Sequence, residues 1–477
     1  MKANNIIIGL AVLAYTSCKT PQATIVPDRI KQTLPQKYEG TVDSIKHSAV
    51  LTPWRQFFTD SKLVSLIDTA LVNNQDLMMT LQQIEMAKSD VLLSQGRLLP
   101  SVSLGGSIGV DKVGRYTSEG AGNASTDIKP GKAMPDPLMN YTGGLQADWE
   151  VDLWNKLKDG KKAAVESYLA TVEGKNAVLS TLIATVAEKY DNLLCLDNQL
   201  KVIQQYIELQ KKALELSKIQ KQANAGTELG VKKFEAELAK ARSTEFALKQ
   251  QIVETENGLN QLLGRYPTLI DRSSSTFMES VPQIVTSGFP SELIFNRPDV
   301  RQAEHQLAAT KWNVEAARKE FLPSLNISGA LGLEAFNPTY LTHLPQSLAF
   351  SLMGGMAGPL INKKAIQANF NNANAQQIEA LYQYDKTLLS AYIEVCTLME
   401  KNKNLNEYYK LKQTEKKTLD ESVDIANKLY LSGGADYLDV LMDQRDALDA
   451  TMDLLDAKQQ QLINIVYLYK SLGGGWQ

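Results

Sequence analysis

The sequence predicts a mixed, mostly α-helical fold in which long coiled-coil helical hairpins are combined with four β-strands in an internal duplication. Three observations predict this class. Apolar residues recur every seven positions over long stretches without proline. Four segments of roughly ten residues alternate between apolar and polar side chains. Landmark motifs recur roughly 210 residues apart, which is too long a period for a solenoid and indicates a duplicated unit.

Composition limits the function before any motif is considered. The 477 residues carry 50 Lys and Arg against 53 Asp and Glu, a net charge of −3, which argues against a nucleic-acid-binding protein. Three cysteines cannot build a disulfide framework, and three histidines (His47, His305 and His343) offer little for a metal or acid–base site. The mean hydropathy of −0.22 is typical of a water-soluble protein. After the first twenty residues no apolar run reaches the roughly 18 residues of a membrane helix.

The first eighteen residues predict export. A basic start is followed by an apolar run from Ile6 to Tyr15, too short to span a bilayer, and by small residues up to Cys18. This placement resembles a bacterial lipoprotein signal, with residues 1–17 as the signal peptide and Cys18 as the lipidated residue. Tyr15 stands where such signals usually have leucine, so an ordinary secretion signal is the alternative.

The two halves of the mature chain share one plan. Their matching landmarks are Leu99-Pro100-Ser101 with Leu322-Pro323-Ser324, Asn155-Lys156 with Asn362-Lys363, and the helix breaker Gly226 with Gly434. We therefore expect four segments after the signal: an N-terminal linker over 18–60, a first repeat over 61–270, an inter-repeat linker over 271–289 and a second repeat over 290–477.

Each repeat contains a pair of alternating segments, which predict β-hairpins at about 101–153 and about 324–360. Segments of this length cross a bilayer as tilted strands, although a soluble sheet with one wet face is the commoner alternative. The segment around Trp149 favours a lipid-facing outside and a water-filled inside, because its acids lie on the face opposite Trp149 and Leu153. The expected lumen residues are Gln146, Asp148, Glu150 and Asp152. The stretch 111–140 is rich in Gly, Ser, Asn and Pro and predicts a long irregular surface loop.

Long helices follow each predicted hairpin. Seven-residue columns of apolar side chains, one of them with a gap at Thr255, indicate left-handed coiled-coil packing. The columns are Leu179, Val186, Leu193, Leu200, Ile207 and Leu214, then Phe234, Ala241, Leu248 and Leu262, and finally Leu441, Leu448, Leu455, Leu462 and Tyr469. The first helix is predicted over about 155–222, with turns at 224–230 and 432–436. Four strands cannot close a barrel, and open strand edges in lipid are costly, so strands and helices must close across several chains.

The chain resembles the TolC-like outer-membrane factors, most closely the lipoprotein branch that serves resistance-nodulation-division efflux pumps. The resemblance covers essentially the whole mature chain. Its most specific motifs are Arg297-Pro298-Asp299-Val300-Arg301 and the terminal Gly473-Gly474-Gly475-Trp476, supported by Trp54-Arg55-Gln56-Phe57-Phe58, Trp149-Glu150-Val151-Asp152-Leu153-Trp154 and Tyr437-Leu438-Asp439-Val440-Leu441.

The resemblance implies a homotrimer that shares one transmembrane β-barrel in the outer membrane and one periplasmic α-barrel. It implies a passive exit duct for small toxic compounds, docked by a periplasmic adaptor onto an inner-membrane pump, with no cofactor, metal or enzymatic activity. Two alternatives stay open: a duct for type I protein secretion, and a lipid-anchored periplasmic coiled-coil adaptor, which would lack the alternating strands.

The predicted helix turns are the candidate gate. Asp436, Asp439 and Asp443 follow the second turn at spacings that place them on one helix face. Asp439 stands where the family commonly has a pore-lining aspartate, and three copies would form rings of carboxylates that favour cations. The alternative is that these acids only stabilise the start of a helix. The turns themselves resemble the adaptor-contacting tips of the family, namely Ala225, Gly226, Thr227, Gly433, Gly434 and Ala435.

Rival chemistry is weakly supported. Gly105-Gly106-Ser107-Ile108-Gly109 matches a nucleophile-elbow pattern, but it lies inside an alternating segment instead of between a strand and a helix. Met353 and Met356 could suggest soft-metal handling, although two methionines near a strand end more often serve packing.

Overall fold

The computed structural model describes residues 21–23, 35, 52–224, 226–279, 290–359 and 363–476. The predicted signal peptide, Cys18, Ala225 and most of the predicted inter-repeat linker lie outside these residues. The described chain forms two compact units, to which both repeats contribute. One unit contains residues 86–168 and the described parts of 305–381; the other contains 52–85, 382–476 and the described parts of 169–304.

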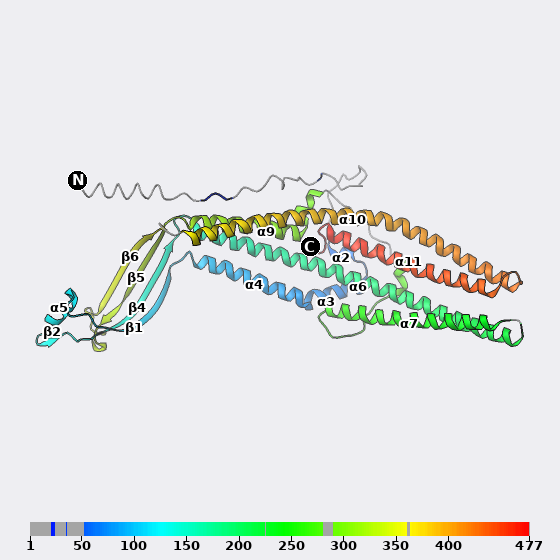
Figure 1. Ribbon diagram of the computed structural model, residues 1–477, viewed down its shortest axis with the longest axis horizontal. Coiled ribbons are helices and arrows are strands. Elements are labelled where there is room, and N and C mark those ends of the chain that lie inside the picture. Colours follow the sequence, from blue (N-terminus) through cyan, green and yellow to red (C-terminus); the bar gives the residue numbers. More distant parts are fainter. Residues whose placement is uncertain are drawn as a thin grey trace. The chain divides into compact units, whose positions relative to one another are not determined.

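The first unit is built on a four-stranded antiparallel sheet with the order β1-β4-β5-β6 (Figure 1). Its strands are β1 (Ser101–Asp111), β4 (Leu138–Val151), β5 (Ser324–Ala335) and β6 (Leu348–Ala357). The four strands and both hairpins are those that the alternating segments predict. Among the described residues, β1 and β6 each pair along one edge only.

The strand register divides the sheet into an apolar and a polar face. Leu104, Leu145, Leu331 and Phe350 lie side by side across the four strands, and between 47% and 81% of each is exposed. On the opposite face, Ser103 pairs with Gln146, and Asp148 lies between Ser101 and Ser328. Because directly paired residues point to the same side, the alternation in sequence becomes two continuous surfaces.

The predicted irregular loop between β1 and β4 is wrong in detail. It contains α5 (Ser118–Ser125) and a small sheet of β2 (Asp127–Lys129) and β3 (Lys132–Ala133). Local capping produces both: Thr117 accepts a hydrogen bond from the Gly120 N–H, and Asp127 accepts one from the N–H of Gly131, whose φ of +79° suits a tight turn. The shorter connection between β5 and β6 holds the 3-10 helix η4 (Pro338–Tyr340).

Long helices make up the second unit and extend into the first. The main ones are α4 (Gln75–Gly96), α6 (Lys156–Gln222), α7 (Glu228–Leu262), α9 (Pro298–Lys319), α10 (Lys364–Leu431) and α11 (Tyr437–Ser471). Shorter elements are α2 (Trp54–Phe57), α3 (Ser61–Asn73), η2 (Ser274–Glu279), η3 (Pro290–Glu292) and α8 (Leu293–Asn296). The predicted turns are confirmed, since α6 and α10 end at Gln222 and Leu431. None of the described helices combines the length and the apolar character needed to cross a membrane.

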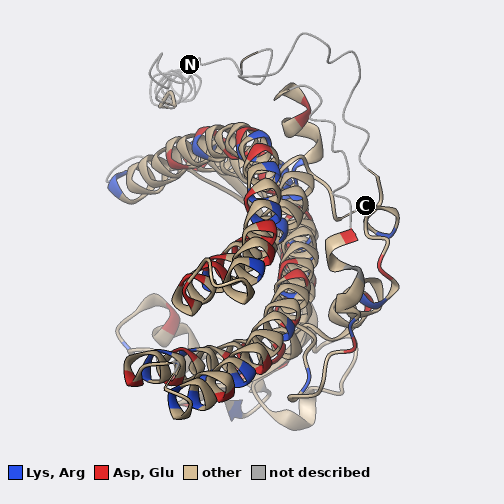
Figure 2. Ribbon diagram, turned by 90° about the vertical axis from the view of Figure 1, so that its right-hand side faces the viewer, with Lys and Arg blue, Asp and Glu red and all other residues tan. Residues whose placement is uncertain are grey.

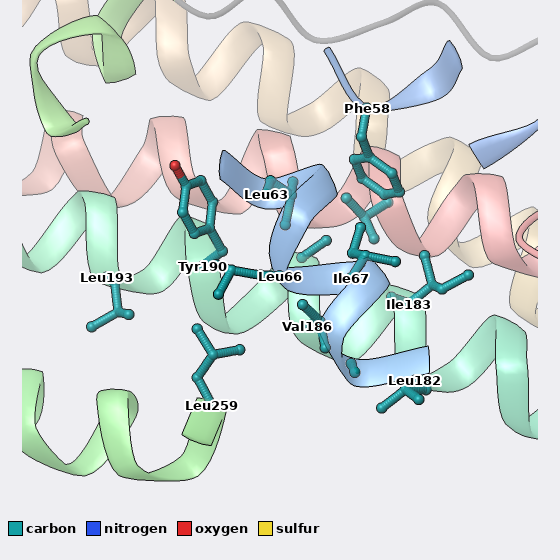
Figure 3. Packing of buried hydrophobic residues seen from close by; sticks show 14 of the residues in the cluster. Phe58, Leu63, Leu66, Ile67, Leu182, Ile183, Val186, Tyr190, Leu193 and Leu259 are labelled. Carbon is teal, nitrogen blue, oxygen red and sulfur yellow. The ribbon is translucent and has the colours of Figure 1, made fainter. Parts of the chain in front are cut away.

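The seven-residue columns form the core of the second unit. Val186 and Leu193 of α6 are fully buried, and Leu455 and Tyr469 of α11 are at most 5% exposed. Figure 3 shows Leu66 and Ile67 of α3 packed against Val186 of α6. The coiled-coil interpretation therefore predicts the buried faces of these helices.

The two most specific motifs of the sequence meet at one junction. The guanidinium of Arg297 bonds Asp299, Glu394 of α10 and the carbonyl of Ser471 at the end of α11, with distances of 2.7–3.0 Å. Trp476 donates from Nε1 to the Asn296 carbonyl at 3.1 Å. A side chain at Gly473, whose φ is +99°, would come within 2.3 Å of that same carbonyl oxygen. Both motifs therefore have a structural role.

Candidate functional site

The second helix turn is a close-fitting reversal between α10 and α11. Gly433 adopts a φ of +77°, and the Gly434 N–H donates to the Leu429 carbonyl at 2.8 Å. This arrangement satisfies the last carbonyls of α10 and explains why glycine is needed at Gly433. Asp436 then begins α11.

The first helix turn also reverses the chain direction, but a different residue type adopts the left-handed conformation. Asn224 supplies the left-handed residue with a φ of +57°, and Thr227 begins α7 by accepting a hydrogen bond from the Gly230 N–H at 3.1 Å. Gly226 has no such backbone requirement. The predicted tip residues Gly226, Thr227, Gly433 and Gly434 therefore lie at two exposed helix reversals of the second unit.

Aromatic side chains join the two turns. The ring of Tyr437 lies 4.7 Å from that of Tyr430 and 5.0 Å from that of Phe234, measured between centroids. Gln220 of α6 also donates a hydrogen bond to the Tyr430 hydroxyl. Burial raises the pKa of the Tyr437 hydroxyl. The ends of the two hairpins are thus held together by rings from α7, α10 and α11.

Each of the three predicted gate acids has a local structural partner. Asp436 and Asp439 form a capping box, in which Asp439 Oδ2 accepts from the Asp436 N–H at 3.1 Å. Asp443 accepts a hydrogen bond from the Ser422 hydroxyl of α10 at 2.9 Å. Asp436 and Asp439 remain exposed, so the capping role leaves their carboxylates available to solvent. The exposed Met442 lies between Asp439 and Asp443.

The acidic row on α11 is longer than the sequence analysis predicts. Asp446, Asp449 and Asp453 continue it and line a groove between α10 and α11 together with Glu415. Lys412 of α10 bridges Asp453 and Glu415 at 2.8 Å, and these hydrogen bonds raise the pKa of its ammonium group. A signal for this row was present, because Asp439, Asp446 and Asp453 are spaced by seven residues. Figure 2, viewed from the end that carries the turns, shows charged residues of both signs along the helices that face the viewer.

The polar face of the sheet carries three of the four predicted lumen residues. Gln146, Asp148 and Glu150 lie on β4, and Glu150 forms an ion pair with Lys156. Asp152 follows the strand, and its carboxylate accepts from the N–H groups of Leu157 and Lys158 at the start of α6. That contact gives Asp152 a role at the strand–helix junction.

A belt of small residues crosses the same polar face. Gly105, Gly144, Gly332 and Ala349 are paired in sequence across the four strands. A Cβ added at Gly144 would lie 2.4 Å from the Gly332 Cα, so the backbones of β4 and β5 approach as closely as only glycine allows.

One protein-family model matches most of the chain. The model described as outer membrane efflux protein matches residues 66–265 and 289–474. The chain is 26% identical to the cation efflux system protein CusC of Escherichia coli O6:H1, over 98% of this chain and 97% of that protein. It is 28% identical to the solvent efflux pump outer membrane protein SrpC of Pseudomonas putida, over 92% and 91% of the two chains.

Two further similarities bear on the anchor and the fold. The chain is 24% identical to the probable outer membrane lipoprotein SilC of Salmonella typhimurium, over 93% of each chain. A crystal structure of CusC superposes with a TM-score of 0.81 and 24% identity, covering 96% of this chain and 100% of that one. The fold of strands and long helical hairpins is therefore shared with solved outer-membrane channels.

Proposed function

Since the chain belongs to the outer membrane efflux protein family, we propose that three copies close into one exit duct that carries small toxic compounds across the outer membrane. Its location is the outer membrane and its activity is efflux. Family members act as the outer-membrane component of tripartite systems, together with an adaptor and an inner-membrane pump. The homotrimer and the docking of this chain onto an adaptor and a resistance-nodulation-division pump belong to the proposal.

One observation carries the proposal: a four-stranded sheet with an exposed apolar face and two half-paired edge strands. Closed membrane barrels need roughly eight or more strands. Three copies would supply twelve, pairing β1 of one copy with β6 of the next and leaving no edge in lipid. The leucines and Phe350 of the apolar face would then contact lipid tails.

The polar face would line the lumen of this barrel. Gln146, Asp148 and Glu150 would face water there, while Asp152 would lie where the strand enters α6. The belt of Gly105, Gly144 and Gly332 would widen the lumen at its own level, because no side chain projects from it.

The acids of α11 would form the gate in the assembled trimer. Each of Asp436, Asp439 and Asp443 would occur three times around the axis, and a ring of three carboxylates attracts cations and resists close packing. Asp439 is the strongest candidate, since it is exposed and only one of its oxygens is used in the capping box. The reversals at Ala225, Gly226 and Thr227 and at Gly433, Gly434 and Ala435 would receive the adaptor.

Cys18 would anchor the chain through lipid. It lies outside the described residues, and the support is the signal-like sequence before it together with the similarity to a probable outer membrane lipoprotein. Substitution Cys18→Ser should abolish incorporation of labelled palmitate while leaving the duct fold intact. Incorporation that persists in this variant would exclude Cys18 as the anchor.

Cargo identity is decided by the partner pump in this proposal. Similar proteins are named for cation and for solvent efflux, so one fold serves different cargo. Three measurements test the whole proposal: membrane fractionation, the mass of the detergent-solubilised particle in multiples of the mature chain's mass, and toxin accumulation compared with protein export after deletion. Loss of protein export alone would favour a type I secretion duct. Partition with the inner membrane would favour the adaptor alternative.

A further inference from the structure

Basic residues flank the four points at which the strands of the first unit join its helices, which Figure 1 shows. They include Arg97 after α4, Lys156 and Lys158 at the start of α6, Lys319 at the end of α9 and Lys364 at the start of α10. The loops at the opposite end of the sheet mix both signs, as in the 3.8 Å pair of Arg115 and Asp136.

The acidic side chains nearest these junctions already have partners. They are Glu150 with Lys156, Asp152 with backbone N–H groups of α6, Asp159 with Lys162 and Lys319, and Glu320 with Asn369. Arg97, Lys158 and Lys364 are exposed, and none of the three forms an ion pair with a described residue. We call these three residues the basic collar. Its positive charge is therefore not neutralised by the described chain itself.

Helix stability does not account for two members of the basic collar. Lys158 lies in the first turn of α6, and Lys364 is the first residue of α10. Positive charge at a helix N-terminus opposes the helix dipole and destabilises the helix. Arg97 differs, because it follows the end of α4, where the dipole favours a cation. The two lysines thus present charge that is locally unfavourable and open to a partner outside the chain.

Two tryptophans lie between the apolar face of the sheet and the basic collar. Trp149 of β4 is paired with Ile327 on the apolar face, and Trp154 follows the strand with 43% of its surface exposed. Their indole N–H groups donate to the carbonyls of Leu98 at 3.1 Å and Pro323 at 2.7 Å. An indole with an apolar ring and a satisfied polar edge is typical of the boundary between membrane and water.

We propose that the basic collar binds the phosphate groups of anionic phospholipids in the periplasmic leaflet of the outer membrane. The order from apolar strands through tryptophans to basic side chains follows the polarity profile of a membrane surface. Lysine ammonium groups bind phosphate oxygens as point charges, so a headgroup with net negative charge is favoured over a zwitterionic one. This inference rests on the proposed function, because it places the sheet in the outer membrane.

Quenching of tryptophan fluorescence by brominated lipids tests the proposal, because Trp149 and Trp154 lie beside the basic collar. The full-length protein is reconstituted into bilayers that mix phosphatidylglycerol with phosphatidylcholine, one of which carries bromine. Phosphatidylglycerol should occupy the sites next to the tryptophans about fivefold more strongly than phosphatidylcholine, since one Lys or Arg near an anionic surface contributes roughly this factor. The triple variant Arg97→Gln/Lys158→Gln/Lys364→Gln should bind the two lipids almost equally.

A matched control removes the same charge from exposed lysines of α6 and α7 in the second unit. The variant Lys201→Gln/Lys233→Gln/Lys240→Gln should keep the preference for phosphatidylglycerol. The proposal is overturned if the unsubstituted protein shows no headgroup preference or if the control loses the preference equally. Displacement of the brominated phosphatidylglycerol by excess soluble inorganic phosphate would also overturn it, because the site would then be one for free anions. Quenching by neither lipid would overturn the proposed function as well, whereas quenching without headgroup preference overturns the lipid site alone.

Discussion

The two helix turns occupy equivalent positions in the two repeats, but their acidic side chains are paired differently. At the first turn Glu228 pairs with Lys221 and Lys232, and Glu235 pairs with Lys232 at 2.8 Å. At the second turn Asp436 and Asp439 bond backbone groups, and no Lys or Arg forms an ion pair with either among the described residues. The same hairpin architecture thus presents a neutralised end in one repeat and an acidic end in the other.

This difference teaches that two repeats with one plan can pair the acidic side chains near their turns in different ways. One hairpin retains internally balanced charges suited to a structural wall. The other accumulates carboxylates along α11, from Asp436 to Asp453, among which Asp446 pairs with Arg445 at 3.6 Å and Asp453 pairs with Lys412 at 2.8 Å. Four changes would break or sharpen this contrast.

The largest effect is expected from removing the ring that connects the turns. Phe234 is 2% exposed, and Phe234→Ala leaves a cavity between α7 and Tyr437, which should cost about 3–5 kcal/mol of local stability. Hydrogen exchange at both turns should accelerate together. Leu229→Ala, at a 64% exposed position of the same helix, is the control and should change little. Acceleration at only one turn would mean that the rings do not couple them.

The second-largest effect is expected from substituting the glycines of the two turns, because their backbone conformations differ. Gly433→Ala forces a side chain into a φ of +77° and should destabilise the second turn by about 1–2 kcal/mol. Gly226→Ala brings a Cβ to a tight 3.2 Å from Gln220 Cβ and Lys221 N but needs no left-handed backbone, so it should cost less. Limited proteolysis at each turn measures this order. Equal sensitivity of the two variants would contradict the contrast in turn geometry.

The effect of charge at the proposed gate is best isolated by the substitution Asp439→Asn. The amide oxygen can still accept the hydrogen bond of the capping box, so folding is preserved while each chain loses one negative charge, which makes three in the proposed trimer. Block of single-channel current by divalent cations should weaken several-fold in planar bilayers. Glu228→Gln, the matched change at the first turn, should leave block unaltered. Unaltered block in Asp439→Asn would remove this residue from the gate.

The smallest effect concerns the ion pairs of the first turn. The hydrogen bonds from Lys221 and Lys232 lower the pKa of Glu228 and Glu235, so their stabilisation is present above the unfolded-state pKa and is lost as the pH falls through the folded-state values. Protection of the first turn from hydrogen exchange should fall between pH 7 and pH 3, and Lys232→Ala should make that fall smaller. High salt should mask the substitution, since these side chains are exposed. A large effect at the second turn would be unexpected.

Periodicity predicted most of the fold. Alternation located β1, β4, β5 and β6, and the seven-residue columns predicted the buried faces that contain Val186 and Leu455. These features depend on local spacing alone. The helix α5 and the β2–β3 hairpin were missed because they depend on single capping contacts from Thr117 and Asp127, which leave no periodic trace.

The candidate site was predicted less completely. The spacing places Asp436, Asp439 and Asp443 on one helix face. The capping box and the contact with Ser422 depend on the local backbone and on the packing of α10 against α11, which spacing does not specify. The alternation predicts Asp152 as a lumen residue, but β4 ends one residue earlier, at Val151. The Asp152 carboxylate instead accepts a hydrogen bond at the start of α6.

The burial of Tyr469 of α11 has a consequence for biogenesis. Phe57 near the beginning of the described chain stacks on Tyr469 at 4.0 Å, and the Tyr469 hydroxyl donates to the Thr52 carbonyl. In a chain exported from its N-terminus, α2 can therefore reach its packed position only after α11 has been exported. A chain cut short before Tyr469 lacks both contacts and leaves the ring of Phe57 uncovered.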